Sequence, residues 1–209
     1  MSEFDYLESV LPGFSKAREI IKAADDSALP LQYKGSKFDF YRFCNRYRMA
    51  AKFKGILLDG FGDETEKGYS ALTHVFLTWS VFERYTELAG DRPPYRQLLA
   101  LVPKMELAKL ADHIERHDPE HRLYDFLHGQ SLEQNQSYLE RYRDGDRRGV
   151  VFYAASIRHI YVHGHLTASP NRCNSEDLTS ICNALTHFLV ELVRKDFQRR
   201  LAIASAPNR

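Results

Sequence analysis

Arginine and histidine side chains gather at the end of one apolar segment, and their spacing suits chemistry on a phosphate. Arg158 and His159 follow the apolar run, and His163 stands just before Gly164. A guanidinium holds a phosphate through parallel hydrogen bonds, and an imidazole exchanges protons near neutral pH. Attack of a ribose 2′-hydroxyl on phosphorus needs a base, an acid and positive charge against the developing phosphorane. The cluster is therefore a candidate site for RNA cleavage.

The segment from Val150 to Ile157 is expected to position this cluster, because its apolar residues recur at helical spacing. They predict a buried amphipathic helix that delivers the polar residues at its C-terminal end. Gly164 is predicted to follow the helix in a left-handed conformation. Residues five apart lie well apart around a helix, so Arg158 and His163 converge only if the helix end unwinds or a second chain contributes.

The pattern Arg158-His159-x-x-x-His163 resembles the Arg-x(4–6)-His signature of the HEPN superfamily, in which Asn, Asp or His often follows the arginine. Members are helical bundles, and many are metal-independent endoribonucleases that dimerise so that two motifs face one composite site. The resemblance implies a homodimeric endoribonuclease, a toxin or defence effector, with Arg158, His159 and His163 as catalytic residues. It also implies RNA as substrate, no cofactor, and an antitoxin or a nucleotidyltransferase as a further partner.

Two other interpretations of these residues stay open. Arg158 can cap carbonyl groups near the helix end while His163 packs beneath the following loop. His159 and His163 also have the i, i+4 spacing of two zinc ligands, with His165 as a third. However, Ile160 occupies the position of the glutamate in an HExxH hydrolase, so we expect no metal. The alternative function is a non-catalytic helical module that binds RNA, a nucleotide or a protein partner.

Basic side chains interleaved with aromatic residues between positions 34 and 54 favour contact with a phosphate backbone and unpaired bases. Four arginines just upstream of the motif helix could extend the same surface: Arg141, Arg143, Arg147 and Arg148. The residues expected to bind RNA are Arg42, Arg46, Arg48, Lys52, Arg147 and Arg148. A solvated basic face on an amphipathic helix would have the same pattern. The histidine repeat at His113, His117 and His121 is interrupted by Pro119, and we expect it to be structural on a solvated face.

Apolar residues at a 3.6-residue period predict most of the remaining chain to be helical, and strand signals are scarce. Asp63 and Glu66 resemble a capping box at the start of a long helix, and Asn174 or Ser175 is expected to cap the last one. The predicted helical segments are 14–24, 33–58, 63–89, 95–101, 103–116, 123–127, 131–143, 150–163 and 175–201. The predicted fold is all-α, an HEPN-like helical bundle with an additional irregular helical insertion.

The length of 209 residues suits a single HEPN-like helical domain, 1–209. We expect an N-terminal extension at 1–32 and a core at 33–201 that contains the insertion, about 91–129. The 29 basic and 28 acidic side chains nearly balance, so a polyanionic partner can be inferred only from local clusters. No apolar run is long enough to cross a membrane, and acidic residues near the start do not suit a signal peptide, so the expected location is the cytoplasm.

The three cysteines are Cys44, Cys173 and Cys182, an odd number that contains no CxxC pair. This pattern argues against a disulfide framework and against a zinc ribbon. We therefore expect three buried thiols.

Overall fold

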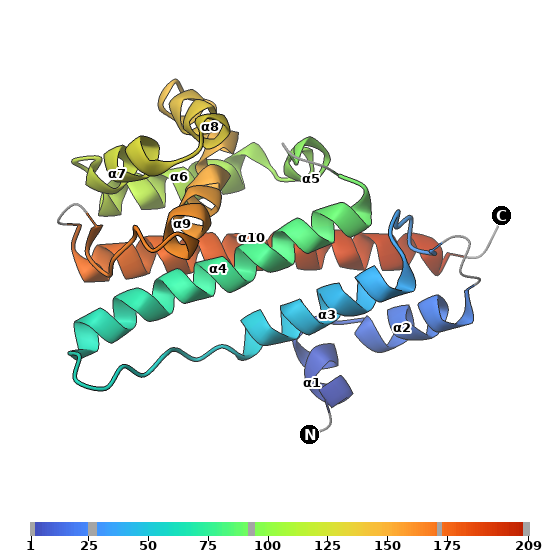
Figure 1. Ribbon diagram of the computed structural model, residues 1–209. Coiled ribbons are helices and arrows are strands. Elements are labelled where there is room, and N and C mark those ends of the chain that lie inside the picture. Colours follow the sequence, from blue (N-terminus) through green and yellow to red (C-terminus); the bar gives the residue numbers. More distant parts are fainter. Residues whose placement is uncertain (1–2, 25–28, 92–94, 171–172, 207–209) are drawn as a thin grey trace. The chain divides into compact units, whose positions relative to one another are not determined.

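The computed structural model describes residues 3–24, 29–91, 95–170 and 173–206, and in these ranges the chain forms helices and no β-strand (Figure 1). The prediction of an all-α fold is confirmed. No helix in the described ranges is both long enough and apolar enough to cross a membrane. The chain divides into two compact units: unit 1 is Met1–Lys52, Ser80–Leu101 and Val190–Arg209, and unit 2 is Phe53–Trp79 and Val102–Leu189.

Unit 1 combines the N-terminal helices with one short helix and the second halves of two long ones. Its elements are α1 (Glu3–Val10), α2 (Phe14–Ala23), α3 (Lys37–Lys52), α5 (Arg96–Ala100), residues 80–89 of α4 (Asp63–Ala89) and residues 190–204 of α10 (Ser175–Ala204). The sequence did not predict α1. Of the predicted insertion, positions 92–94 lie outside the described residues.

Aromatic rings fill the interior of unit 1. The rings of Phe14 and Phe40 stack with centroids 6.4 Å apart, and those of Phe43 and Tyr85 lie 5.0 Å apart. Phe40, Phe43 and Tyr47 are all buried, as expected from their spacing along one face of α3. Burial of each large apolar side chain stabilises the fold by about 1.5–3 kcal/mol, so these rings contribute substantially to the stability of unit 1.

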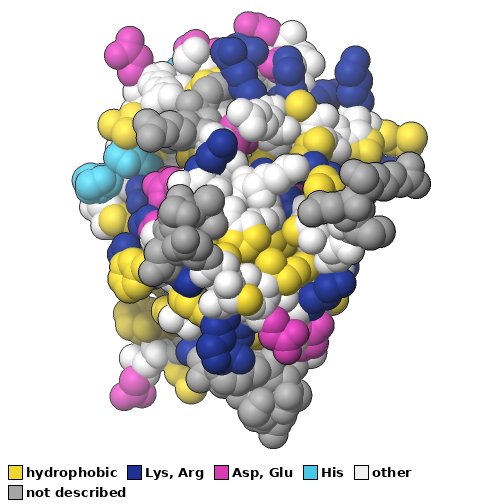
Figure 2. All heavy atoms as spheres, turned by 90° about the vertical axis from the view of Figure 1, so that its right-hand side faces the viewer, with side chains coloured by type: hydrophobic (Ala, Val, Ile, Leu, Met, Phe, Trp, Pro, Cys, Tyr) yellow, Lys and Arg dark blue, Asp and Glu magenta, His cyan; other side chains and the backbone are white. Residues whose placement is uncertain are grey.

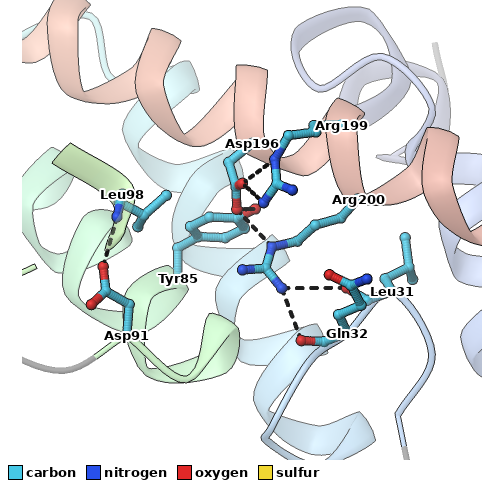
Figure 3. A network of polar contacts seen from close by, with 8 residues as sticks. All are labelled: Leu31, Gln32, Tyr85, Asp91, Leu98, Asp196, Arg199 and Arg200. Carbon is cyan, nitrogen blue, oxygen red and sulfur yellow. Dashed lines mark hydrogen bonds and ion pairs between the residues drawn. The ribbon is translucent and has the colours of Figure 1, made fainter. Parts of the chain in front are cut away.

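A buried carboxylate joins three parts of unit 1 (Figure 3). Asp196 on α10 accepts hydrogen bonds of 2.7 Å from the Tyr85 hydroxyl and 2.7 Å from Arg200 Nε. Arg200 also donates through Nη1 to the carbonyl oxygen of Gln32, at 2.8 Å. Burial disfavours the charged carboxylate, but hydrogen bonds from Arg200, Arg199 and Tyr85 outweigh it and lower the pKa of Asp196. Asp196 and Arg200 are therefore a hydrogen-bonded ion pair inside unit 1.

Unit 2 contains the motif and the helices that surround it. Its elements are residues 63–79 of α4, α6 (Lys104–His117), α7 (Arg122–Gln130), α8 (Glu133–Arg143), the 3-10 helix η1 (Arg147–Val151), α9 (Phe152–Val162) and residues 175–189 of α10. Both α7 and α8 pack against α9, and α6 and α8 pack against η1. The rings of Tyr138 on α8 and Phe152 on α9 stack 3.8 Å apart. These helices fix the start of α9 on several sides.

The prediction of one helix from 33 to 58 is wrong at both ends, because α3 begins at Lys37 and stops at Lys52. Gly55 has a φ of 135°, which no helix allows. The backbone N–H of Ile56 donates to Ser70 Oγ at 3.0 Å. The apolar residues after Lys52 continue the helical spacing, yet this backbone bonds to a side chain of α4.

The capping box predicted at Asp63 and Glu66 is also wrong. The carbonyl oxygen of Gly62 accepts hydrogen bonds from Thr65 N and Glu66 N, so the N-cap is Gly62 and Asp63 is already the first residue of α4. The Glu66 carboxylate accepts from the backbone N–H of Leu58 at 2.8 Å. Glu66 therefore holds the preceding loop against α4, a role that the pattern of residues within the helix could not indicate.

Two other local predictions are confirmed. Asn174 Oδ1 accepts from the backbone N–H of Glu176 at 2.8 Å, so Asn174 caps α10. All three cysteines, Cys44, Cys173 and Cys182, are buried free thiols. Burial raises the pKa of Cys173 to about 11, which keeps this thiol protonated at neutral pH.

Candidate functional site

The motif segment enters the interior of unit 2 through η1 and leaves it at the end of α9. Gly149 allows η1 to approach α8 closely, because a Cβ at this position would stand 2.5 Å from the carbonyl oxygen of Tyr138. Every residue from Phe152 to Ile157 is buried, whereas Val162 and His163 are exposed. As the sequence predicted, α9 is a buried helix that brings the polar cluster to the surface of unit 2.

The end of α9 is closed by a Schellman motif. Gly164 has a φ of 74°, the left-handed conformation predicted from the sequence. Its N–H donates to the carbonyl oxygen of Tyr161 at 3.0 Å, and the N–H of His165 donates to that of Ile160 at 3.1 Å. These two bonds satisfy the last carbonyl groups of the helix and set the direction in which the chain leaves it. The backbone that carries His163 is thus held in one conformation.

His159 and His163 form an imidazole pair on one side of this helix end. Their ring centroids are 4.6 Å apart, with the edge of one ring toward the face of the other. His159 is half-buried and His163 is exposed. Burial is the largest cause that lowers the pKa of His159, and the neighbouring charges of His163, Arg158 and His165 lower it further. At neutral pH His159 is therefore uncharged and able to accept a proton.

Arg158 is half-buried in the same turn as His159. Because α9 remains helical to Val162, its end does not unwind before the motif is complete. Side chains five residues apart on such a helix point in directions about 140° apart, so Arg158 and His163 diverge within one chain. The structure brings together His159 and His163, and it places Arg158 on a different side of α9.

Tyr161 joins the motif helix to another helix, a contact that the sequence did not suggest. Its hydroxyl lies 2.8 Å from that of Thr73 on α4, and both residues are half-buried. The two residues are 88 positions apart, so no local pattern connects them. Tyr161 is thus the residue of the motif that anchors the last turn of α9.

Four of the residues expected to bind RNA lie on α3 in unit 1. Arg42 and Lys52 are exposed, and Arg46 and Arg48 are half-buried. The guanidinium of Arg42 lies over the exposed ring of Phe38, 5.1 Å from its centroid. The ammonium of Lys52 lies 4.5 Å from the ring centroid of Tyr6.

The other two expected residues, Arg147 and Arg148, lie in unit 2 and bond to carboxylates. Arg147 pairs with Glu115 and lies 3.9 Å from Asp112, and Arg148 Nε donates to Asp146 at 3.0 Å. Their positive charge is partly offset by these partners. On the face drawn in Figure 2, lysine and arginine side chains form separate groups with acidic and hydrophobic side chains between them.

In the part of the chain that the structure describes, no three His, Cys, Asp or Glu side chains are grouped to hold a metal ion. His159, His163 and His165 therefore do not form the three-ligand set considered from their spacing. The imidazole pair remains as two proton-transfer groups, and the Arg158 guanidinium belongs to the same turn of α9 but points to a different side of the helix. Such a set suits acid–base chemistry near an anion.

No protein-family profile, curated protein or solved structure matches this chain. The all-α fold and the geometry at the end of α9 are thus the observations from which a function can be argued. The resemblance of the motif to the HEPN superfamily stays a prediction.

Proposed function

We propose that this protein is a metal-independent endoribonuclease whose reactive groups lie at the end of α9. The observation that carries the proposal is the contact between the His159 and His163 rings, 4.6 Å apart on a helix end held by a Schellman motif. Arg158 in the same turn supplies a permanent positive charge. The HEPN resemblance of these three residues supports the same function.

The proposed reaction transfers two protons and exchanges one P–O bond. His159, uncharged because its pKa is lowered, accepts the proton of the ribose 2′-hydroxyl as the 2′-oxygen attacks phosphorus. The bond from phosphorus to the 5′-oxygen breaks, and His163 acts as the general acid that donates a proton to that oxygen. The products are a 2′,3′-cyclic phosphate and a 5′-hydroxyl. Arg158 stabilises the charge that develops on the phosphorane oxygens.

The divergence of Arg158 and His163 supports a two-fold dimer as the active form. In such a dimer, Arg158 of one chain faces His163 of the other across a composite site. Mixing the Arg158→Ala and His163→Ala variants tests this arrangement, because a mixed dimer contains one intact composite site. An equal mixture should recover about a quarter of the wild-type activity, since half the dimers are mixed and each has one of two sites. No recovery after subunit exchange would contradict the shared site.

The experiment that tests the function is cleavage of single-stranded RNA with a chelator present. His163→Ala should lower the cleavage rate by about 10²–10⁴-fold and leave RNA binding nearly unchanged, because proton transfer stabilises only the transition state. His165→Ala is the matched control: it removes an exposed imidazole two residues away and should keep the rate. An unchanged cleavage rate in His163→Ala would refute the assignment of His163. If the wild-type protein binds RNA and does not cleave it, the non-catalytic module is favoured instead.

A toxin or defence role in the cytoplasm is part of this proposal. It predicts that expression of the wild-type chain arrests growth and degrades cellular RNA, whereas expression of His163→Ala does neither. A co-expressed antitoxin or nucleotidyltransferase partner would suppress the arrest. Normal growth with intact RNA at high wild-type expression would argue against this role without affecting the test of cleavage in solution.

A further inference from the structure

A second group of reactive side chains lies in unit 2, between α6 and α10, and it shares no residue with the motif. Ser180 Oγ and His117 Nε2 are 3.1 Å apart, and His117 Nδ1 lies 2.8 Å from Asp177 Oδ1. Each ring nitrogen of His117 thus has its own partner, a hydroxyl on one side and a carboxylate on the other. This is the order of contacts in a Ser-His-Asp triad, which is recognised by geometry rather than by position in the sequence.

The helical spacing of these residues explains how two helices bring them together. Asp177 and Ser180 are three residues apart on α10, and His113 and His117 are four apart on α6, so each pair shares one face of its helix. The two imidazole centroids are 4.7 Å apart. Asn174 caps the start of α10 and fixes the turn that carries Asp177. Four polar side chains therefore meet where α6 faces α10.

The partners of each atom determine where the hydrogens lie. A carboxylate only accepts hydrogen bonds, so His117 Nδ1 carries the hydrogen that points to Asp177. In neutral His117 the other nitrogen, Nε2, then has a free lone pair and accepts from the Ser180 hydroxyl. This is the tautomer in which an imidazole can take a proton from a serine.

His113 completes the orientation of the serine. Its Nε2 lies 3.0 Å from Ser180 Oγ and 3.3 Å from the carbonyl oxygen of the same residue. A carbonyl only accepts, so Nε2 of His113 is the donor in both contacts. Ser180 Oγ accepts from His113 and donates to His117, which fixes its hydrogen on the His117 side.

Ser180 is also one of the residues that line a cleft. The cleft has a volume of about 350 Å³ and is lined by Glu64, Lys67, Ser175, Glu176, Thr179, Ser180 and Asn183. The side chains of His117 and Asp177 are 31% and 38% exposed, so water can reach the triad. Lys67 and Asn183 line the same cleft and carry an ammonium and an amide, donors of the kind that stabilises an oxyanion. The volume is at the lower end for small-molecule sites, and the lining residues are of polar or charged types.

We propose that Ser180 is a nucleophile for acyl transfer from small carboxylic esters, with His117 as its general base and Asp177 and His113 as positioning residues. Ser180 Oγ attacks the carbonyl carbon, its proton passes to His117 Nε2, and the carbonyl electrons move to the oxygen near Lys67 and Asn183. The C–O bond then breaks and the alcohol leaves with the proton from His117. A water molecule attacks the acyl group on Ser180 by the same route, which releases the acid and restores the serine.

The first test uses diisopropyl fluorophosphate on the full chain, followed by mass spectrometry of the peptides. The expected result is one phosphoryl adduct at Ser180, formed as the Oγ–P bond replaces the P–F bond and fluoride leaves. Folded wild-type protein without an adduct at Ser180 would overturn the proposal. Ser137→Ala is the matched control, because Ser137 is an exposed serine of α8 outside both the triad and the cleft, and this variant should label at the wild-type rate.

Variants separate chemistry from packing, since the same hydrogen bonds also hold α6 against α10. His117→Gln keeps a polar side chain but cannot take the proton, so the maximal labelling rate should fall by about 10²–10⁴-fold. Asp177→Asn and His113→Gln should lower that maximal rate while the probe concentration for half-maximal rate stays unchanged. An unchanged maximal rate in these variants would show that the contacts only pack the helices, which would refute the proposal.

This site is independent of the proposed nuclease. Ser180→Ala should lose the adduct and keep RNA cleavage, whereas His163→Ala should lose RNA cleavage and keep the adduct. Loss of the Ser180 adduct in folded His163→Ala would contradict a separate site.

Discussion

The hydroxyl groups of Thr73 and Tyr161 lie 2.8 Å apart and tie the last turn of α9 to the first half of α4. Tyr161 stands between His159 and His163 in the sequence, so this bond fixes the turn that carries the imidazole pair. Neither Thr73 nor Tyr161 occupies a defined position of the Arg158–His163 pattern. The stability of α9 therefore depends on a contact made by a residue at an undefined motif position.

Tyr161→Phe removes this bond and keeps the ring. It should lower the free energy of unfolding by about 0.5–1.5 kcal/mol, the net value of a typical hydrogen bond. Thr73→Val should cost a similar amount, and the double variant should cost less than the sum. Urea unfolding of the four proteins measures the coupling. Additivity within about 0.3 kcal/mol would mean that the two hydroxyls do not stabilise each other.

Gly164→Ala tests the left-handed end of α9. A Cβ at Gly164 meets no atom within 4 Å, so the substitution adds backbone strain without a clash. The strain of a left-handed alanine should cost about 1–2 kcal/mol. Gly129→Ala is the control, because Gly129 also has open space but lies inside α7, where alanine should stabilise by up to about 1 kcal/mol. Thermal unfolding measures both variants. Melting temperatures that change in the same direction for Gly164→Ala and Gly129→Ala would contradict this difference.

Asp196 should make the fold sensitive to acid. Its folded pKa is lowered, so its stabilisation is present above the unfolded value of about 3.9 and is lost as the pH falls toward the folded pKa. Asp196→Asn leaves Arg200 without its charged partner and should cost about 3–5 kcal/mol near pH 7. The cost should shrink at lower pH, because wild-type Asp196 is then protonated as well.

Urea unfolding of the wild type and of Asp196→Asn at several pH values measures this effect. Glu87→Gln is the control, since Glu87 is 57% exposed in its pair with Arg84 and should change stability by less than about 1 kcal/mol. A cost for Asp196→Asn that does not depend on pH would show that shape, rather than charge, determines its role.

The proposed RNA binding should depend more on α3 than on the arginines before α9. Replacing Arg42 and Arg46 with glutamine should reduce the slope of log affinity against log salt by about 1.4, since each single-strand phosphate contact contributes about 0.7. The same change at Arg147 and Arg148 should leave the slope nearly unchanged, because these side chains already pair with carboxylates. Fluorescence anisotropy at several salt concentrations measures both. Equal slopes for the two double variants would contradict this ranking.

The sequence predicted those features that depend on residues within one or two helical turns. The left-handed Gly164 and the Asn174 cap are satisfied by bonds to residues at most three positions away. Helical periodicity identified α4, α9 and α10 for the same reason. The periodicity failed after Lys52, where Gly55 and the Ser70 hydroxyl replace the helical bonds. Spacing alone could not show that backbone groups would bond to side chains of another helix.

Contacts between distant residues could not be predicted. His117 lies 63 positions from Ser180 and 60 from Asp177. The expected solvated face at His113 and His117 is wrong, because both rings are half-buried and hydrogen-bonded. The pairing of the His159 and His163 rings follows from their i, i+4 spacing, whereas the orientation of Arg158 depends on α9 staying helical to Val162.

The boundary between the two units falls inside α4, between Trp79 and Ser80, and inside α10, between Leu189 and Val190. No single cut of the chain therefore releases either unit, and a truncation that removes one also shortens a helix of the other. For the same reason, a single recombination event cannot transfer the motif-bearing unit to another gene intact. A continuous segment that holds all of unit 2, residues 53–189, therefore also carries residues 80–101 of unit 1.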